Sequence, residues 1–346
     1  ATNKEVKAKG FNRAEYTMPY LDWFEPPREK NGACMLFITG GGYNACVDGL
    51  WIDLLAKRFT ELGYVCVNLT YRTPRPKGLP IYQSAWQDGQ RAVRLVREAA
   101  KDRGFDPEKI GALGFSAGSH MTVLLGTSSL TPAYQAVDEL DKLPCHINLA
   151  VPVYTAYALS DGLTGANSRD GNGVDVRLSD AFQFDEKTCA MSLFHGGTDV
   201  YSPNGSIQIY RELRRMNIPA EIHLVADRGH GFMGNPNKGE DGTAFDHWID
   251  RITEFMRQMN FDSQLGKEVD LMSRYESDEA RGNYRKEPIW PNGKIPDIQT
   301  RQNTPYLEWH MPRQLKTKAI QIIYSGGGYG GNSPDSFEVA PARRYL

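Results

Sequence analysis

Short runs of apolar residues alternate along the chain with longer stretches in which apolar positions recur every three or four residues. Six runs have the length and the apolar content of buried strands: 33–39, 64–69, 109–115, 146–153, 191–195 and 220–225. Five stretches have the spacing of helices: 50–62, 84–101, 117–125, 206–216 and 243–259. Strands that alternate with helices predict an α/β fold, in which a mostly parallel central sheet is covered by helices on both faces.

The segment at 154–190 interrupts this alternation. It is rich in Gly, Asp, Ser and Asn and has little periodicity. Loops of this length inside a compact domain are uncommon and are often functional. Two interpretations stay open, namely a segment that covers a bound substrate and a solvated excursion from the domain.

The chain after residue 261 has a different character. Residues 262–302 are polar and charged and contain three prolines, which predicts a linker or an extended wrap. Residues 303–346 then repeat features from the start of the chain. Three pairs of segments share one offset of 286 residues: 19–23 with 305–309, 39–43 with 325–329, and 56–59 with 342–345.

This shared offset predicts a repeated domain. We interpret residues 1–261 as one domain, 262–302 as a linker, and 303–346 as the start of a second copy that ends within its first helix. Such a fragment could not bury its own apolar strand at 319–324. The alternative is that this strand docks on a sheet edge of the same chain or of a neighbouring chain, which would form a dimer through the C-terminal segment.

Composition narrows the class of protein. The 346 residues include 40 Lys and Arg and 42 Asp and Glu, a net charge of −2, which argues against a nucleic-acid or membrane-surface partner. No run of 18 apolar residues exists, so no transmembrane helix is expected. The five cysteines are widely spaced without a C-x-x-C pair, which indicates neither a zinc ribbon nor a disulfide scaffold.

A serine in a glycine-flanked turn is the strongest chemical signal. The segment at 114–118 reads Gly-Phe-Ser-Ala-Gly and fits G-x-S-x-G, between the predicted strand at 109–115 and the predicted helix at 117–125. This strand–turn–helix context is typical of a nucleophile elbow, where small residues let the strand and the helix approach closely. We therefore predict that Ser116 is a nucleophile.

A serine nucleophile needs a base and a residue that orients the base. In enzymes with this elbow the acid and then the histidine follow the serine along the chain. Of the seven histidines, His230 fits best because it lies in a glycine-containing loop after the last predicted strand. Asp199 follows the predicted strand at 191–195 and is the preferred acid. Asp227, three residues before His230, is the rival, although its position suits a local turn better.

Backbone amides must also stabilise the negative charge of a tetrahedral intermediate. Ala117 directly follows the nucleophile, and three glycines at 40–42 follow the first predicted strand of the alternating block. Glycine lets the main chain approach a substrate without a Cβ in the way. We therefore assign the oxyanion hole to the amides of Gly41, Gly42 and Ala117. A phosphate-binding loop is the weaker alternative, because no G-K-[ST] or G-x-G-x-x-G follows.

Taken together, these motifs resemble a known family. The bacterial esterase branch of the α/β-hydrolase fold has similar segments, with the greatest similarity to acetylxylan and feruloyl esterase-like carbohydrate esterases, which are related to the hormone-sensitive-lipase-like esterases. Those families often have His before the three glycines, whereas this chain has Thr39 there and Ser325 in the repeated segment. The segments that carry the resemblance are 40–43, 106–110, 114–120, 195–199 and 229–232.

The resemblance implies a serine ester hydrolase that removes acetyl or feruloyl groups from plant cell-wall polysaccharide such as xylan. It implies no metal or organic cofactor. Tyr43, Trp51, Trp86 and Tyr201 are candidate flat faces for sugar rings, with ordinary packing as the alternative. The polymeric substrate, together with the missing initiator Met before Ala1, leads us to expect a secreted or periplasmic protein.

Two other functions compete with this interpretation. A serine peptidase of the prolyl-oligopeptidase type shares the order of nucleophile, acid and base, but no propeller-like repeats precede the alternating block. A non-catalytic binding module of the same fold is disfavoured by the presence of Ser116, Asp199 and His230.

Overall fold

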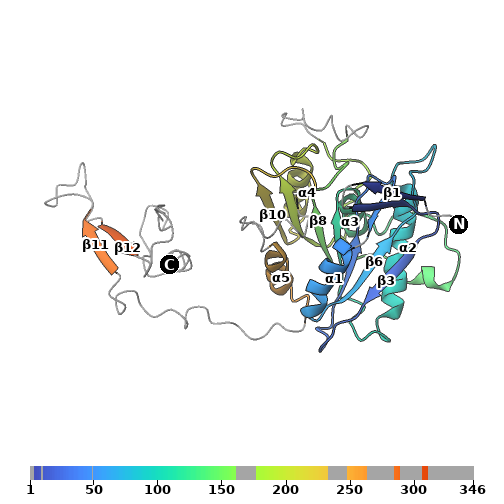
Figure 1. Ribbon diagram of the computed structural model, residues 1–346, viewed down its shortest axis with the longest axis horizontal. Helices are drawn as coiled ribbons and strands as arrows, with labels where there is room; N and C mark the ends of the chain where they lie inside the picture. Colours follow the sequence, from blue (N-terminus) through green and yellow to red (C-terminus); the bar gives the residue numbers. More distant parts are fainter. Residues whose placement is uncertain are drawn as a thin grey trace. The chain divides into compact units, whose positions relative to one another are not determined.

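The computed structural model divides into two compact units, Ala1–Gly266 and Lys267–Leu346 (Figure 1). The division falls close to the predicted end of the first domain. No helix in the described ranges is both long and apolar enough to cross a membrane. The residues that the structure describes are 4–8, 11–48, 50–160, 177–232, 248–262, 284–288 and 306–310.

A seven-stranded sheet forms the centre of the first unit. Its strand order is β10-β9-β8-β7-β4-β6-β3, and every neighbouring pair is parallel except β3 with β6. This sheet confirms the predicted α/β class. The strands in chain order are β3 (Tyr20–Phe24), β4 (Cys34–Ile38), β6 (Val65–Thr70), β7 (Ile110–Phe115), β8 (Leu149–Val153), β9 (Ala190–Gly196) and β10 (Ala220–Val225).

Helices cover both faces of this sheet. The helices are α1 (Leu50–Glu61), α2 (Gln83–Ala99), α3 (Ala117–Thr127), α4 (Asn204–Arg215) and α5 (Trp248–Gln258), with a short 3-10 helix η1 (Glu139–Lys142). Side chains alternate along β4, so Leu36 joins the apolar cluster that includes α2, α3 and α4, whereas Phe37 joins the cluster that includes α1 and α5. Burial on both faces explains why the central strands read as continuous apolar runs.

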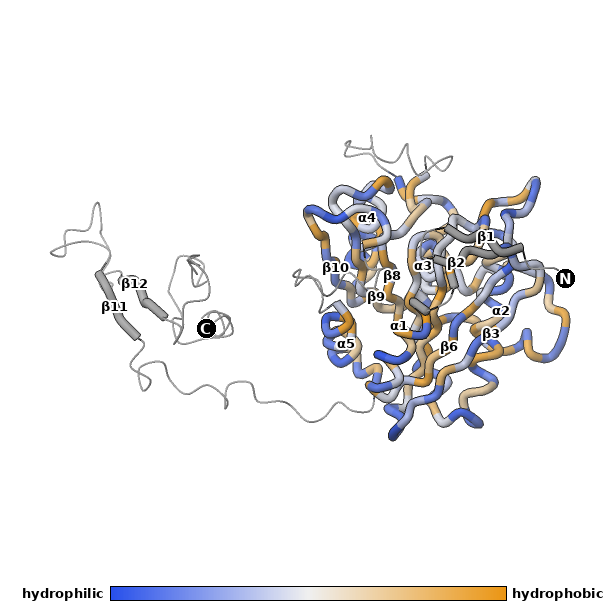
Figure 2. The backbone as a smooth tube through the Cα atoms, viewed as in Figure 1, coloured by the Kyte–Doolittle hydropathy of each residue, from blue (hydrophilic) through white to orange (hydrophobic). Residues whose placement is uncertain are grey.

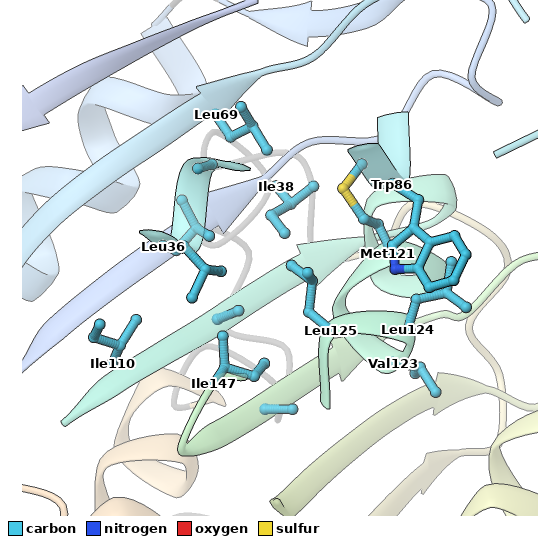
Figure 3. Close-up of a cluster of buried hydrophobic side chains, with 14 of the residues drawn as sticks. Leu36, Ile38, Leu69, Trp86, Ile110, Met121, Val123, Leu124, Leu125 and Ile147 are labelled. Atoms are coloured by element: carbon cyan, nitrogen blue, oxygen red, sulfur yellow. The ribbon is translucent and has the colours of Figure 1, made fainter. Parts of the chain in front are cut away.

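Apolar residues are concentrated in the central strands and on the helix faces that cover them. In Figure 2 the tube is mainly hydrophobic along central strands such as β6 and β8, whereas helices α2 and α4 alternate in colour. Figure 3 shows one of the two cores, where Trp86 of α2 and Met121 and Leu125 of α3 gather beside Ile38. Helices α2 and α4 therefore contribute one apolar stripe each, as their spacing predicts, whereas α3 is buried along its whole length.

Short antiparallel strands lie outside the predicted elements. In the first unit, β1 (Lys4–Ala8), β2 (Phe11–Glu15) and β5 (Cys46–Asp48) form a three-stranded sheet. In the second unit, β11 (Tyr284–Pro288) pairs with β12 (Tyr306–His310). β11 lies within the segment predicted as a linker, so part of that segment is a strand. β12 follows β3 by 286 residues, the offset of the sequence repeat. Both matched segments are therefore strands.

Several predictions from the sequence fall partly on residues that the structure does not describe. The interrupting segment is described at 154–160 and 177–190, where Leu159 and Leu178 form an isolated bridge, but not between them. The first five residues of the last predicted helix and the second glycine triplet at 326–328 also lie outside the described ranges.

Candidate active site

Ser116 occupies a strained turn between β7 and α3. Its backbone has φ of 57° and ψ of −116°, a conformation that costs a non-glycine residue free energy and is concentrated at functional sites. The flanking glycines make this turn sterically feasible. A Cβ at Gly114 would lie 2.2 Å from Thr122 Oγ1, and a Cβ at Gly118 would lie 2.1 Å from the Ile38 carbonyl oxygen. The motif is therefore a packing requirement at this position.

Three predicted residues form one hydrogen-bonded chain. Ser116 Oγ lies 2.8 Å from His230 Nε2. His230 Nδ1 lies 2.9 Å from Asp199 Oδ2 and 3.0 Å from Oδ1. The Asp199 side chain is fully buried, whereas that of His230 is 26% exposed. The residues follow the carboxyl ends of β7, β9 and β10, so parallel strands bring them to one edge of the sheet.

Backbone contacts join the loops that hold Asp199 and His230. Thr198 N donates to the carbonyl oxygen of Arg228 at 3.1 Å, and Gly197 N donates to that of Val225 at 2.7 Å. A Cβ at Gly196 would lie 2.1 Å from the Arg228 carbonyl oxygen, so a larger residue would separate the two loops. The glycines before Asp199 therefore bring the acid within reach of the imidazole.

The carboxylate of Asp199 has a second support. Its Oδ1 accepts a hydrogen bond from Tyr201 N at 2.8 Å. The Tyr201 carbonyl oxygen lies 3.0 Å from His195 Nε2, and His195 Nδ1 lies 2.8 Å from Ser206 Oγ. Burial lowers the pKa of His195, which favours a neutral ring that donates from Nε2 and accepts from the serine hydroxyl. His195 thus braces the loop of the acid and does not itself contact Ser116 Oγ.

The rival acid lies apart from this chain. The Asp227 side chain is 80% exposed, and its carboxylate lies 3.7 Å from Arg228 Nε. It precedes His230 by only three residues, yet its carboxylate lies in solvent. Both oxygens near His230 Nδ1 belong to Asp199.

The glycine loop lies directly over the serine. A Cβ at Gly40 would lie 3.0 Å from Ser116 Cβ. The Gly40 carbonyl oxygen accepts from Val47 N at 3.1 Å, and that of Gly41 accepts from Asn44 N at 3.1 Å. Because the N–H of a trans peptide points opposite to its C=O, the next amide in each case points away from these partners.

These amides have the availability that an oxyanion hole requires. In the described part of the chain, the N–H groups of Gly41, Gly42 and Ala117 have no protein acceptor. Ala117 is the first residue of α3, so its N–H is one of the donors that a helix leaves without an intrahelical partner. The residue before the glycines, Thr39, is held through its backbone. Its carbonyl oxygen accepts a hydrogen bond from the Tyr71 hydroxyl at 3.0 Å.

Two of the predicted aromatic substrate contacts are wrong. Tyr43 is 1% exposed, and its hydroxyl lies 2.8 Å from Nδ1 of the buried His120. Burial lowers the pKa of His120 to about 3, so this ring is a neutral packing partner. Trp86 is 7% exposed within the core that Figure 3 draws. Neither ring has a free face for a sugar, and the side chain of Trp51 lies outside the described residues.

Tyr201 does lie at the site, and three further residues there were not predicted. The ring centroid of Tyr201 is 4.9 Å from that of His230, and the ring centroid of Tyr154 is 5.0 Å from it. Tyr157 contacts Tyr201, and Arg75 contacts Tyr157. The available signal for the two unpredicted tyrosines was their place after β8, the strand next to that of the nucleophile.

The sheet order, the strained turn after β7 and the order of Ser116, Asp199 and His230 define the α/β-hydrolase fold. Residues 21–202, just over half of the chain, match the model of the BD-FAE family. The chain therefore belongs to the BD-FAE family. This match confirms the resemblance to carbohydrate-esterase-like members of the fold.

Curated relatives carry related names. The chain is 33% identical over 210 residues to endo-1,4-β-xylanase B of Butyrivibrio fibrisolvens, covering 57% of this chain and 32% of that protein. It is 31% identical over 108 residues to an acetylxylan esterase of Xylanibacter ruminicola, covering 30% and 21%. An esterase of Mycobacterium tuberculosis, LipQ, is 33% identical over 108 residues, covering 31% and 24%. The chain thus spans a third or less of these relatives.

Solved structures share the fold. An acetyl ester-xyloside bifunctional hydrolase from Caldicellulosiruptor lactoaceticus has a TM-score of 0.54 and 22% identity, covering 72% of this chain and 89% of that one. A butyrate-bound esterase from Thermogutta terrifontis has a TM-score of 0.55 and 22% identity, covering 72% and 92%.

Proposed function

We propose that this chain is a serine ester hydrolase that removes acetyl or feruloyl groups from plant cell-wall polysaccharide such as xylan. The observation that supports the chemistry most directly is the hydrogen-bonded chain from Ser116 through His230 to Asp199. The observation that supports the substrate is the similarity to relatives whose names refer to xylan and to its acetyl esters.

The first half of the reaction forms an acyl-enzyme. Ser116 Oγ attacks the ester carbonyl carbon while His230 Nε2 takes the hydroxyl proton. Asp199 holds the imidazole by its Nδ1–H and stabilises the positive charge that the ring gains. The negative charge on the carbonyl oxygen is stabilised by the amides of Ala117, Gly41 and Gly42. Collapse of this intermediate breaks the ester bond, and His230 gives the proton to the leaving sugar hydroxyl.

The second half releases the acid. Water enters the place of the sugar hydroxyl, and His230 takes a proton from it as the water oxygen attacks the acyl carbon. The same amides hold the second oxyanion. Its collapse breaks the bond to Ser116 Oγ, which recovers a proton from His230. The catalytic groups then have their starting protonation states.

Release of acid from polymer tests this proposal. Acetylated xylan and feruloylated arabinoxylan are incubated separately with the wild-type chain and with Ser116→Ala, and acetate and ferulate are quantified. We expect acetate or ferulate from the wild type, and none above background from the variant. Folding of both proteins is compared by circular dichroism.

Each outcome has a definite meaning. Release of only one acid would assign the acyl group and leave the mechanism in place. No acid from either polymer by a folded wild-type chain, with cleavage of small prolyl peptides instead, would contradict the esterase proposal and favour the peptidase. Equal release by Ser116→Ala would contradict the assignment of the nucleophile.

A further inference from the structure

Backbone strain at this edge of the sheet extends beyond the serine. Tyr43, Tyr154 and Tyr157 have φ of 61°, 41° and 56° respectively, in the left-handed region that bulky residues rarely adopt. Conformations of this kind are unfavourable for bulky residues and persist only where the surroundings hold them. Two of these tyrosines lie within four residues after the end of β8, so this short segment is held in place against its own backbone preference.

Contacts with the elbow hold this segment. Ala156 N donates to the Ser116 carbonyl oxygen at 3.3 Å, and Ser116 N donates to the Val153 carbonyl oxygen at 3.1 Å. The hydroxyls of Thr155 and Ser119 lie 2.7 Å apart. The Tyr157 backbone is therefore fixed relative to the nucleophile, and its side chain extends from a rigid base.

Arg75 connects this segment to the glycine loop. Its Nε donates to the Gly42 carbonyl oxygen at 2.8 Å, and its Nη2 donates to the Tyr157 hydroxyl at 2.5 Å. The guanidinium carbon also lies 5.3 Å from the centroid of the Tyr157 ring. In the described part of the chain, Arg75 forms no ion pair. Its guanidinium is therefore held by the Gly42 carbonyl and the Tyr157 hydroxyl.

Tyr157 is also linked, through Tyr201, to the catalytic base His230. The rings of Tyr157 and Tyr201 lie with their centroids 5.4 Å apart, and burial together with the nearby Tyr157 hydroxyl raises the pKa of Tyr201. The Tyr201 ring packs against His230 with centroids 4.9 Å apart. One set of contacts therefore runs from the Gly42 carbonyl through Arg75, Tyr157 and Tyr201 to the imidazole.

We propose that Arg75 and Tyr157 are a pair of positioning residues that fix the oxyanion loop of this hydrolase by holding the Gly42 carbonyl. The proposal rests on the esterase function proposed above and adds two residues to its machinery. The Gly41 carbonyl is already held by amides of its own loop. The hydrogen bonds to the Gly41 carbonyl orient the peptide plane that contains the Gly42 N–H, and the hydrogen bond from Arg75 orients the next plane. With both planes held, the backbone cannot rotate at Gly42, so its N–H keeps its direction.

The chemistry of this pair requires an arginine. Its planar guanidinium directs Nε and Nη2 to two acceptors at once, whereas a lysine ammonium is a single point of charge on a flexible stem. A fixed amide is worth most where negative charge develops, because it needs no rearrangement during the reaction. Loss of the pair should therefore lower kcat more than it raises KM.

Kinetics of single variants test this role. Tyr157→Phe, Arg75→Ala and Arg75→Lys are compared with the wild type on p-nitrophenyl acetate, a small neutral ester, and thermal unfolding of each is recorded. We expect each variant to lower kcat by about 10- to 100-fold with KM changed by less than about threefold, because small misplacements of catalytic groups have effects of this size. Tyr157→Phe should unfold at nearly the wild-type temperature.

A matched control exists elsewhere on the first unit. Arg94 Nη1 donates to the Tyr134 hydroxyl at 3.0 Å and lies over that ring at 5.5 Å, yet this pair contacts none of the site residues. Tyr134→Phe removes the same kind of hydrogen bond, together with the one that the Tyr134 hydroxyl donates to Asp141, and should leave kcat and KM unchanged. Wild-type kcat in Tyr157→Phe, or an equal loss in Tyr134→Phe, would overturn the positioning role.

Two further outcomes complete the test. Wild-type kcat in Arg75→Lys, together with a low kcat in Arg75→Ala, would mean that the positive charge alone is sufficient. That result would overturn the requirement for simultaneous hydrogen bonds to the Gly42 carbonyl and the Tyr157 hydroxyl. Absence of any ester turnover by the wild type would overturn the esterase function and this inference together. An active wild type with an equally active Tyr157→Phe overturns the inference alone.

Discussion

Replacement of Ser116 by alanine is expected to lower kcat for p-nitrophenyl acetate by about six orders of magnitude, the loss typical of a serine that works as one unit with its base. The variant keeps the Cβ and removes only the Oγ that lies 2.8 Å from His230 Nε2. No other described hydroxyl contacts His230 in this way. The variant should therefore retain the fold and lose the attacking atom.

The measurement is a steady-state assay with enough variant protein to detect slow turnover. Ser192→Ala serves as the control, because Ser192 lies near the start of β9, where its Oγ donates to Glu221 of β10 and takes no part in the site. We expect wild-type kcat within about twofold for this control, as for changes outside a catalytic unit. Turnover by Ser116→Ala within tenfold of the wild type would exclude the serine as nucleophile.

Replacement of Asp199 by asparagine should lower kcat by about four orders of magnitude. The buried carboxylate offers both oxygens to His230 Nδ1, which fixes the tautomer with an unprotonated Nε2 facing Ser116. An asparagine amide presents N–H groups in the same space and favours the opposite tautomer. Its neutral side chain also cannot stabilise an imidazolium ring.

Asp227→Asn is the matched control for this prediction, since Asp227 precedes His230 by three residues and is 80% exposed. Its kcat should stay within about twofold of the wild type, because an exposed charge contributes little to a neighbouring site. A large loss in Asp227→Asn with an active Asp199→Asn would reverse the assignment of the acid.

The sequence was most informative where the chemistry depends on local structure. The turn at Ser116 needs glycines on both sides, and Asp199 and His230 follow apolar strands whose ends must meet in a parallel sheet. The fold class followed from the same alternation of strands and helices. For this reason the three groups of the proposed catalytic chain could be named before their distances were known.

The sequence was less informative about which side chains are exposed at the site, because exposure depends on what packs against each face of a helix or strand. Tyr43 and Trp86 have rings that suit a sugar, but His120 and the α2–α3 core cover them. The contact between Arg75 and Tyr157 joins loops 82 positions apart in the chain, and no local motif indicates it. The edge strand β3 was also missed, because half-exposed residues give it no continuous apolar run.

Covalent labelling tests the central claim most directly. The full chain is treated with a fluorophosphonate, whose phosphorus is attacked by an activated serine, and the modified peptide is identified by mass spectrometry. We expect one adduct per chain, on Ser116, forming in step with the loss of esterase activity and absent from His230→Ala. Loss of activity with the adduct on another residue, or persistent activity in a chain fully modified at Ser116, would contradict the proposed mechanism.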